Sequence, residues 1–301
     1  MTHTILITGG KGTIGRGLSA ALHNKGHRVL WLTRGKIENS PYPAFQWSPE
    51  NNRIDERALQ EADVIIHLAG APINGKRWNK KYKNLLRESR TASSRLLFDK
   101  CAALSRFPIK YITMSATGYY GYDSGDVWKK ETSRFGDDFL ATLAKDWEAG
   151  AQRFAEREVG ALALRTGVVL SPVGGALEEM TRPVKWGLGA ALGSGKQYVS
   201  WIHLDDLVSA IIFLLENNHT GSWNMVAPNP VVNREMMGQI AKCLGRKLIL
   251  PNVPSFVLRA MLGEMASAVL GSSRVSSEKL IDAGFDFKYP DISGALKDLL
   301  P

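Results

Sequence analysis

Residues 7–18 read ITGGKGTIGRGL, and this stretch decides the fold. Gly9, Gly12 and Gly15 follow the apolar residues 5–7 and precede a helical pattern. The first glycine permits a tight turn, the second lets the backbone approach a pyrophosphate, and the third lets helix and strand pack closely. The N-terminus of the helix then faces the phosphates. The stretch therefore predicts the dinucleotide-binding turn of a Rossmann-type domain.

Apolar runs and helical patterns alternate along the first half of the chain. Strands are predicted over residues 28–33, 62–69, 110–115 and 161–170, and helices over 15–24, 79–105 and 137–158. Strands that alternate with helices at this spacing indicate βαβ units, a parallel sheet and right-handed crossovers. The predicted fold class is therefore α/β, with a doubly wound parallel sheet of the Rossmann type.

The character of the sequence changes after residue 171, where glycine-rich loops replace the regular pattern. We predict a Rossmann domain over residues 1–170 and a smaller carboxy-terminal lobe over 171–301, with a subdomain at about 248–298. Residues 200–230 are expected to return to the first domain. The lobe is predicted to hold the substrate.

The composition is that of an ordinary soluble globular protein. Of 301 residues, 44% are hydrophobic and 22% are charged, and no apolar run has the length of a membrane span. Cys101 and Cys243 match no metal-binding spacing, so no metal is expected, and a reducing compartment fits. The first residues lack the features of a secretory leader. These features predict a cytoplasmic protein without a membrane partner.

The net charge is +9, and the densest basic run is GKRWNKKYKNLLRESR at residues 75–90. One interpretation is a solvated helix face, and another is attraction for the phosphates of a cofactor or of a larger polyanion. No nucleic-acid motif accompanies the run, so we expect no nucleic-acid partner. The rival hypothesis, nucleic-acid binding through this run, predicts an affinity that falls steeply with salt.

The end of the second predicted strand, WLTRGK, bears on the choice of cofactor. An acidic residue at this place would bind the ribose hydroxyls of NAD. Arg34 stands there instead, and a guanidinium group suits a 2′-phosphate, to which the hydroxyl of Thr33 adds a donor. The third strand ends in HLAGAP, where the small residues Ala69 and Gly70 leave room for adenosine. The sequence predicts NADP(H) rather than NAD(H).

Several longer motifs, found in one order, carry a resemblance to a known family. They are TGGKGTIG, HLAGAP, MSATGYYG, LRTGVVL, WIHLDDLVSAI and GFDFKYPDISGALKDLL. The chain resembles the extended short-chain dehydrogenase/reductase superfamily, and more narrowly its atypical "epimerase family protein" group, which is similar to NAD-dependent epimerases and dehydratases. The resemblance implies an NADP-binding Rossmann domain, a small carboxy-terminal domain and a poorly defined substrate.

The resemblance also implies where a cofactor would lie. The glycine loop would hold the pyrophosphate, the end of the second strand the 2′-phosphate, and the end of the third strand the adenosine. Arg90 would reach the cofactor from the carboxyl edge of the sheet, and Val169 would line the nicotinamide side. The implied cofactor residues are Gly9, Gly12, Thr13, Ile14, Gly15, Thr33, Arg34, Leu68, Ala69, Gly70, Arg90 and Val169.

The stretch FGDDFLATLAKDWEAGA, residues 135–151, lacks two residues that the resemblance leads us to expect. In this superfamily a Tyr hydroxyl exchanges a proton with the substrate oxygen, and a Lys four residues later lowers the pKa of that Tyr. No tyrosine of the chain has a lysine four residues on. The expected pair would fall on Phe139 and Leu143, or on Ala141 and Lys145.

Other side chains could replace the missing pair. Ser115 ends the fourth predicted strand, although a shift of one residue would put Ala116 in its place. Tyr119 and Tyr120 follow, and Lys145 provides a cation on the helix. The catalytic candidates are therefore Ser115, Tyr119 and Lys145. The structural alternative is that the tyrosines pack under a loop and the lysine is solvated.

The motif WIHLDDL places His203, Asp205 and Asp206 at the start of a predicted helix. The favoured interpretation is a carboxylate N-cap together with a histidine that orients the loop. A catalytic role for these three residues is the less favoured alternative.

The sequence as a whole predicts an NADP(H)-binding oxidoreductase or epimerase that acts on an unidentified small molecule, with a nucleotide-sugar-like compound as one candidate. The alternative is a non-catalytic protein that binds NADP(H) and reports its state to a partner protein. The sequence leaves the oligomeric state open, with a homodimer as one candidate.

Overall fold

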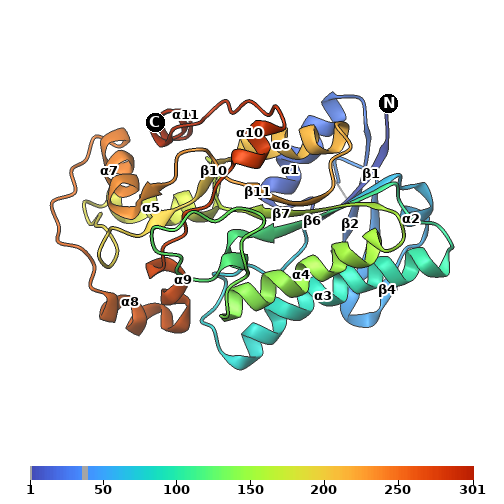
Figure 1. The fold of residues 1–301 in the computed structure, drawn as a ribbon, viewed down its shortest axis with the longest axis horizontal. Helices are drawn as coiled ribbons and strands as arrows, with labels where there is room; N and C mark the ends of the chain where they lie inside the picture. The colour runs from blue at the N-terminus through green and yellow to red at the C-terminus, as the bar shows by residue number, and fades with distance from the viewer. Residues whose placement is uncertain (1, 36–39) are drawn as a thin grey trace.

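The computed structural model describes residues 2–35 and 40–301. In that part of the chain, an eight-stranded sheet runs in the order β11-β7-β6-β5-β1-β2-β3-β4 (Figure 1). Every pair of neighbouring strands is parallel except β3 and β4. The strands are β1 (Thr4–Thr8), β2 (Arg28–Thr33), β3 (Ala44–Ser48), β4 (Arg53–Ile54), β5 (Val64–His67), β6 (Lys110–Ala116), β7 (Gly160–Thr166) and β11 (Gly221–Met225). The predicted α/β class, with a Rossmann-type parallel sheet, is confirmed.

Two layers of helices cover the sheet. On one face α1 (Thr13–Asn24) packs beside α6 (Leu204–Glu216), and on the other α3 (Lys80–Ala103) packs beside α4 (Phe139–Ala155) (Figure 1). The central strands are apolar on both faces because helices cover both faces. The strand order reverses between β1 and β5, and ligands of open α/β sheets bind outside the carboxyl ends of the strands at such a reversal.

One predicted strand, residues 161–170, is wrong as a single element. The chain leaves the large sheet at the end of β7, and β8 (Val168–Leu170) pairs instead with β10 (Trp201–His203). Gly167 lies at the break, where its amide donates to the carbonyl of Met225 and a Cβ atom would lie 2.5 Å from the carbonyl oxygen of Ser200. This close crossing of backbones turns the chain toward the lobe, and an apolar run of residues does not reveal it.

The residues after β8 form most of a smaller lobe, at the left of Figure 1. Its core joins α5 (Gly175–Lys185), α7 (Asn233–Cys243) and α11 (Ile292–Leu299), with Trp201 of β10 completely buried among them. Strand β11, later in the chain, lies beside β7 in the large sheet. A domain boundary at residue 170 stays a prediction. The shorter elements are α2 (Arg57–Glu61), η1 (Pro49–Asn51), η2 (Thr117–Tyr120), β9 (Tyr198–Val199), β12 (Val231–Val232), α8 (Ser255–Leu262), η3 (Gly263–Met265), α9 (Ala266–Leu270) and α10 (Glu278–Asp282).

Two kinds of feature are absent from residues 2–35 and 40–301. None of the helices there combines the length and the apolar character that a membrane crossing requires. The same residues contain no group of three or more His, Cys, Asp or Glu side chains arranged to hold a metal ion.

Candidate cofactor groove and the polar network around Arg165

The glycine loop makes its tight turn immediately after β1. Gly9 has a φ of +73°, in the left-handed region that favours glycine, and its carbonyl accepts a 3.0 Å hydrogen bond from the amide of Gly12. A Cβ atom on Gly15 would lie 2.4 Å from the carbonyl oxygen of Gly9. Helix α1 begins at Thr13, and no side chain in the described part of the chain caps its first amides. The loop therefore leaves N–H donors at the helix N-terminus for an anion.

Gly10 is a fourth required glycine, which the sequence interpretation missed. A Cβ atom on Gly10 would lie 2.4 Å from the indole ring of Trp31 in β2. The indole N–H donates to the hydroxyl of Ser19 at 2.8 Å, and this hydroxyl donates to the carbonyl of Gly15 at 2.6 Å. Trp31 thus fixes the loop and the start of α1 to the second strand. In the sequence, the only indication of this requirement is that Gly10 directly follows Gly9, since the three-glycine pattern itself does not include Gly10.

Two adjoining cavities lie along the carboxyl ends of β1, β2 and β5. One, of about 400 Å³, lies between the glycine loop and the segments 31–35 and 68–70. The other, of about 480 Å³, extends from there to α3. The cavities share four lining residues, namely Arg34, Trp47, Ala69 and Gly70. We refer to the two cavities together as the edge groove.

The edge groove brings together most of the predicted cofactor residues. Seven of them line it, namely Gly9, Gly12, Thr33, Arg34, Leu68, Ala69 and Gly70. Thr13 is exposed at the start of α1, while Ile14 and Val169 pack against the apolar core. Gly15 is buried in the first turn of α1. These four residues and Arg90 are not among those that line the groove.

Two cations stand at the end of the groove beside β2. Arg34 is exposed and lines both cavities. Lys11 reaches across from the glycine loop, since its Nζ lies 4.0 Å from the place of a Cβ atom on Gly35. The amide of Gly35 donates to the Thr33 hydroxyl at 3.2 Å. The sequence interpretation missed Lys11, and the signal was a basic residue inside the glycine motif.

A buried hydrogen-bonded chain supports the floor of the groove. The hydroxyl of Thr8 lies 2.7 Å from Nδ1 of His67 and accepts hydrogen bonds from the amides of Leu68 and Ala69. Nε2 of His67 lies 3.0 Å from the hydroxyl of Ser93 on α3. Burial lowers the pKa of His67 to about 4, so the ring is neutral at pH 7. This chain ties β1, β5 and α3 together directly beneath the loop that borders the groove.

Arg90 lies beneath the loop after β5 rather than in the open groove. Its side chain is 5% exposed, it donates to the carbonyls of Leu86 and Ala71, and its guanidinium group lies 4.6 Å from the ring of Trp147. A Cβ atom on Gly70 would lie 3.1 Å from this guanidinium group. Nε of Arg90 has no hydrogen-bond partner in the described part of the chain. Burial lowers the pKa of Arg90 to about 10, so the group still carries its charge at neutral pH.

Helix α4 provides no tyrosine–lysine pair in either predicted register. Phe139 and Leu143 line a cavity between α3, α4 and η3, while Ala141 is completely buried and Lys145 is exposed. A different residue, Leu140, packs against the short helix η2 that follows β6. The Cβ atom of Leu140 lies 3.1 Å from the place of a Cβ atom on Gly118.

A third pair with the same four-residue spacing begins at Leu140. One turn after Leu140 stands Ala144, which is 3% exposed. This pair has neither a hydroxyl nor a cation. None of the three pairs provides a hydroxyl, and Lys145 is the one cation among them.

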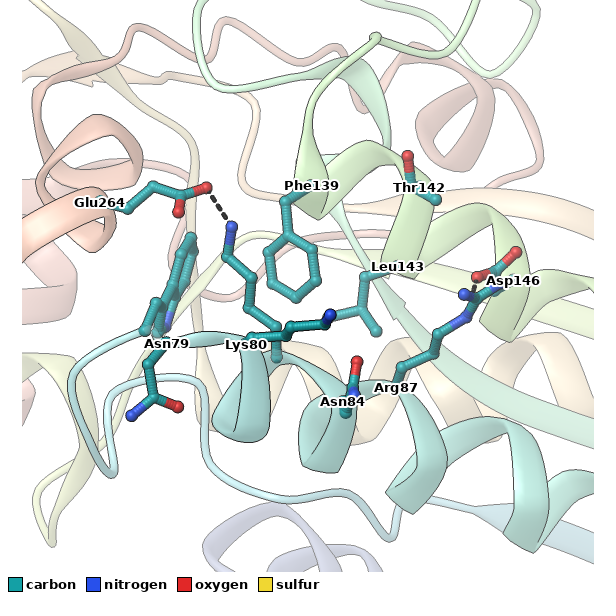
Figure 2. A pocket seen from close by; sticks show the side chains of 11 residues that line it. Asn79, Lys80, Asn84, Arg87, Phe139, Thr142, Leu143, Asp146 and Glu264 are labelled. Atoms are coloured by element: carbon teal, nitrogen blue, oxygen red, sulfur yellow. Dashed lines mark hydrogen bonds and ion pairs between the residues drawn. The ribbon is translucent and has the colours of Figure 1, made fainter.

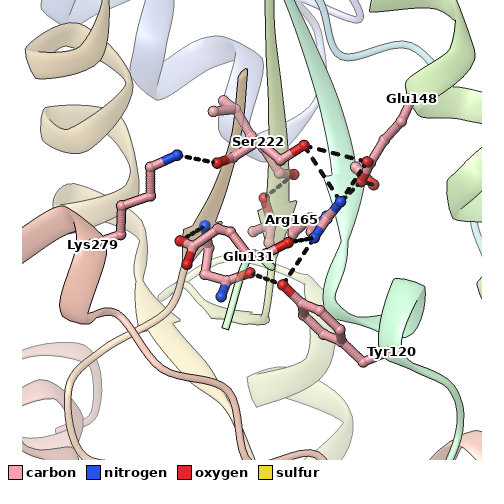
Figure 3. A network of polar contacts seen from close by, with 10 residues as sticks. Tyr120, Glu131, Glu148, Arg165, Ser222 and Lys279 are labelled. Carbon is pink, nitrogen blue, oxygen red and sulfur yellow. Dashed lines mark hydrogen bonds and ion pairs between the residues drawn. The ribbon is translucent and has the colours of Figure 1, made fainter. Parts of the chain in front are cut away.

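A polar network lies farther along α4, around Arg165 of β7 (Figure 3). Glu148 accepts two hydrogen bonds from Arg165, each of 2.9 Å, and a third of 2.8 Å from the hydroxyl of Ser115. The guanidinium group lies 3.4 Å from the ring centroid of Tyr119 and donates to the hydroxyl of Tyr120 at 3.1 Å. The side chains of Arg165 and Glu148 are 4% and 13% exposed, so this ion pair is largely removed from water.

The network continues into the carboxy-terminal residues of the chain. The hydroxyl of Tyr120 donates to Asn224 at 2.7 Å, and the amide of Asn224 donates to Glu131 at 2.9 Å. Lys279 of α10 donates to the carbonyl of Ser222 at 2.7 Å (Figure 3). Burial raises the pKa of Tyr120 to about 12. With its hydroxyl engaged on both sides, Tyr120 serves as a structural bridge between strands.

The three catalytic candidates all lie near this network. Ser115 is 2% exposed and donates to Glu148, and Tyr119 stacks on Arg165. Lys145 lies 4.2 Å from the ring of Phe135 and lines a cavity of about 660 Å³ together with Tyr119 and Glu148. None of the three is among the residues that line the edge groove. Their catalytic role stays a prediction.

The cationic side chains of the basic run, residues 75–90, have different environments. Lys83 pairs with Glu264, Arg87 pairs with Asp146 at 2.7 Å, and Arg90 is buried as described above. The run is therefore only in part the solvated helix face that one interpretation proposed. That the chain has no nucleic-acid partner stays a prediction.

Comparison with known proteins returns one group repeatedly. The NAD dependent epimerase/dehydratase family matches residues 5–225, and a domain of unknown function, DUF1731, matches residues 253–299. The epimerase family protein SAR0825 of Staphylococcus aureus is 35% identical over 301 residues and covers 98% of each chain. The human epimerase family protein SDR39U1 (isoform 2), solved with NADPH, has a TM-score of 0.87 at 31% identity and 98% coverage of both chains. A nucleoside-diphosphate sugar epimerase from Corynebacterium glutamicum has a TM-score of 0.79 at 32% identity, covering 98% of this chain and 57% of that one.

Proposed function

The chain belongs to the NAD dependent epimerase/dehydratase family, and on that premise we propose that it binds NADP(H) in the edge groove and acts as an oxidoreductase or epimerase on a small molecule. The observation that carries the proposal is the pair of cations at the end of β2. Arg34 and Lys11 both line the groove there, and Arg34 stands where an enzyme for NAD would have an acidic residue. A 2′-phosphate with two negative charges suits this pair.

The rest of the groove suits the remainder of a dinucleotide. The glycine loop and the uncapped first turn of α1 provide donors for a pyrophosphate. Ala69 and Gly70 are small and border the part of the groove that extends to α3, which suits an adenosine. Arg90 is a buried cation that lies against Gly70. Its hydrogen-bond partners in the described part of the chain are backbone carbonyls and the Ser89 hydroxyl, and none is a carboxylate. An anion beside it would offset the cost of its burial. The human relative that was solved with NADPH supports the same cofactor.

The chemistry that we propose is hydride transfer, which the nicotinamide of a bound cofactor supplies. Reduction of a carbonyl leaves an oxyanion that must receive a proton. Helix α4 lacks the expected tyrosine and lysine, so we assign proton exchange to Tyr119, with Ser115 and Lys145 as its supporting residues. A nucleotide-sugar-like compound is the substrate class that the similar epimerase from Corynebacterium glutamicum suggests.

A second candidate function follows from the same helix. In three registers of α4 the expected positions carry Phe139, Leu140, Ala141, Leu143 or Ala144, and only Lys145 is polar. A protein that binds NADP(H) without turning it over, and signals its binding to a partner protein, needs no proton donor. A change in partner affinity on cofactor binding would favour this candidate, and an unchanged affinity would count against it.

Calorimetric titration with NADPH and with NADH tests the cofactor assignment. We expect wild-type protein to bind NADPH more tightly than NADH. Arg34→Ala and Lys11→Ala should each weaken NADPH binding by about tenfold to a hundredfold, the range of one lost charge-assisted hydrogen bond, and leave NADH binding nearly unchanged. Lys242→Ala, at an exposed lysine near the end of α7, is the control and should change neither affinity.

Two results would contradict the assignment. Equal affinities of the wild-type protein for the two cofactors would show that Arg34 and Lys11 do not bind the 2′-phosphate. Absence of binding to either cofactor would remove the oxidoreductase function as well.

A further inference from the structure

Another cavity, of about 380 Å³, lies beside the start of helix α3 (Figure 2). The start of α3, the start of α4 and the short helix η3 of the carboxy-terminal region enclose it. Cavities of this size hold small ligands in other proteins. Six of its lining residues define its chemistry, namely Trp78, Lys83, Arg87, Phe139, Leu143 and Glu264. We refer to it as the α3–α4 cavity.

One wall of the α3–α4 cavity is apolar and partly aromatic. The ring of Phe139 packs edge-on against Trp78, with their centroids 5.3 Å apart, and projects toward the centre of the cavity (Figure 2). Leu143, one turn later on α4, continues this wall. Phe139 and Leu143 are one of the two pairs in which a tyrosine and a lysine were expected. An apolar wall at these positions suits a ring or another flat apolar group.

The opposite wall is cationic. Lys80, Lys83 and Arg87 line the cavity from one face of α3, since residues three, four and seven apart share a face of a helix. Figure 2 shows Lys80 and Arg87 on this face. Lys83 pairs with Glu264 of η3, and its Nζ lies 4.8 Å from the centroid of the Phe139 ring. Arg87 pairs with Asp146 of α4. Three cations thus face two carboxylates, so the wall keeps an excess of positive charge.

The α3–α4 cavity is distinct from the edge groove. Residues 85, 88, 89 and 92 of α3 line the groove, and residues 80, 83, 84 and 87 line the cavity. A displacement of five residues turns the helix face by about 140°, at 3.6 residues per turn. No residue lines both sites. A ligand in the cavity therefore occupies a place that NADP(H) in the groove leaves open.

We propose that the α3–α4 cavity binds a small organic anion that combines an apolar ring with a phosphate or carboxylate group. The ring lies against Phe139, and the anionic group takes the place of Glu264 on Lys83. Glu264 is 44% exposed and Lys83 is 25% exposed, so the carboxylate can move into water when an anion displaces it. Since Glu264 belongs to η3, such a ligand releases one contact between the Rossmann helices and the carboxy-terminal region.

Titration with 1-naphthyl phosphate, in the presence of saturating NADPH, tests the proposal. Inorganic phosphate and 1-naphthol serve as the two halves of the probe. We expect 1-naphthyl phosphate to bind the full-length protein at least about tenfold more tightly than either half, because two favourable contacts act together. The NADPH keeps the probe out of the edge groove.

Substitutions on the two sides of one ion pair give effects of opposite sign. Lys83→Met removes the cation and should weaken probe binding about tenfold. Glu264→Gln removes the competing carboxylate and should strengthen it, which a purely structural ion pair would not produce. Phe139→Leu keeps an apolar side chain and should weaken binding less than Phe139→Ala. Lys81→Met, at an exposed neighbouring lysine, is the matched control and should leave binding unchanged.

The outcomes that overturn the proposal are specific. They are absence of millimolar binding by the wild-type protein, equal binding by Lys83→Met, or weaker binding by Glu264→Gln. NADPH affinity, measured for the same variants, reports both folding and the proposed function. Failure of NADPH binding in wild-type protein would contradict the cofactor proposal alone, and the opposite signs at Lys83 and Glu264 would still decide the α3–α4 cavity.

Discussion

At the scale of single residues, the most informative side chains are polar groups that the sheet buries. Thr8, His67 and Ser93 form a chain of hydrogen bonds under the loop that borders the edge groove. A single histidine within an apolar strand forms no sequence pattern from which its role could be predicted. In the structure its two ring nitrogens connect a strand and a helix, and the Thr8 hydroxyl holds the amides of Leu68 and Ala69 in place. The shape of the groove therefore depends on a residue that does not line it.

His67 should make the protein less stable in mild acid. The unfolded chain binds a proton at His67 near pH 6.5, whereas burial lowers the pKa in the folded state to about 4. Between these values the unfolded state binds more protons, so stability falls as the pH drops from about 6.5 to about 4 and then levels off. The full difference is about 3 kcal/mol.

Urea denaturation between pH 4 and pH 7.5 measures this effect. His67→Gln, which keeps a hydrogen-bonding side chain without the titration, should flatten the pH dependence in that window by a large part of the 3 kcal/mol or so. His23→Gln, at an exposed histidine of α1, is the control. Equal slopes for wild-type protein and His67→Gln would show that His67 does not produce the acid sensitivity.

At the scale of elements, the start of helix α4 and its later turns have different surroundings, which the sequence did not distinguish. Its first turns bring Phe139 and Leu143 to the α3–α4 cavity. Its later turns place Glu148 against Ser115 of the sheet and Trp147 against Arg90 of α3. A buried pair such as Arg165 and Glu148 costs desolvation, and breaking one partner is strongly destabilising. The same helix thus explains why Ser115 is buried at the end of its strand.

The catalytic assignment predicts that alanine at Ser115 or Tyr119 abolishes turnover of any substrate that is found. Tyr119→Phe separates chemistry from packing, because the ring that lies 3.4 Å from Arg165 stays while the hydroxyl is removed. If Tyr119 exchanges the proton, Tyr119→Phe should lose as much turnover as Tyr119→Ala. Steady-state kinetics on protein shown to be folded by its circular dichroism is the measurement. Unchanged activity of both Ser115→Ala and Tyr119→Phe would contradict the catalytic assignment of these residues.

The sequence predicted the parts of the fold that local patterns control. Backbone geometry requires Gly9, Gly12 and Gly15, and burial on both faces requires apolar residues in the strands. Each of these constraints therefore produces a recognisable pattern within a short stretch of sequence. The sequence interpretation missed Gly10 and Lys11 because their neighbours are far along the chain, namely Trp31 of β2 and Gly35 just after β2. The end of the strand at Gly167 was not predicted for the same reason, because it depends on the close approach to the backbone of Ser200.

At the scale of the whole molecule, the carboxy-terminal region is fastened to the Rossmann domain by a few buried contacts. Asp206 of α6 is 2% exposed, and its two oxygens accept the amides of Lys288 and Tyr289, each at 2.9 Å. The histidine of the same motif caps α6, because Nδ1 of His203 accepts the amide of Asp205 at 3.0 Å. The prediction of a carboxylate cap was therefore wrong. The motif WIHLDDL joins two parts of the chain.

Asp206→Ala should loosen the end of the chain before it unfolds the sheet. The substitution leaves two buried amides without acceptors, and hydrogen bonds to a charged group are worth about 1.5–3 kcal/mol each. Hydrogen exchange should therefore speed up most in residues 286–301, ahead of β1 and β5. Asp205→Ala is the matched control, because Asp205 is 59% exposed and approaches Lys288 only at 3.9 Å, a distance at which an exposed pair contributes little. If exchange rises equally in both variants, or rises throughout the sheet of Asp206→Ala, then Asp206 is not the fastening point, and the contacts of Lys279 with Ser222 become the next to substitute.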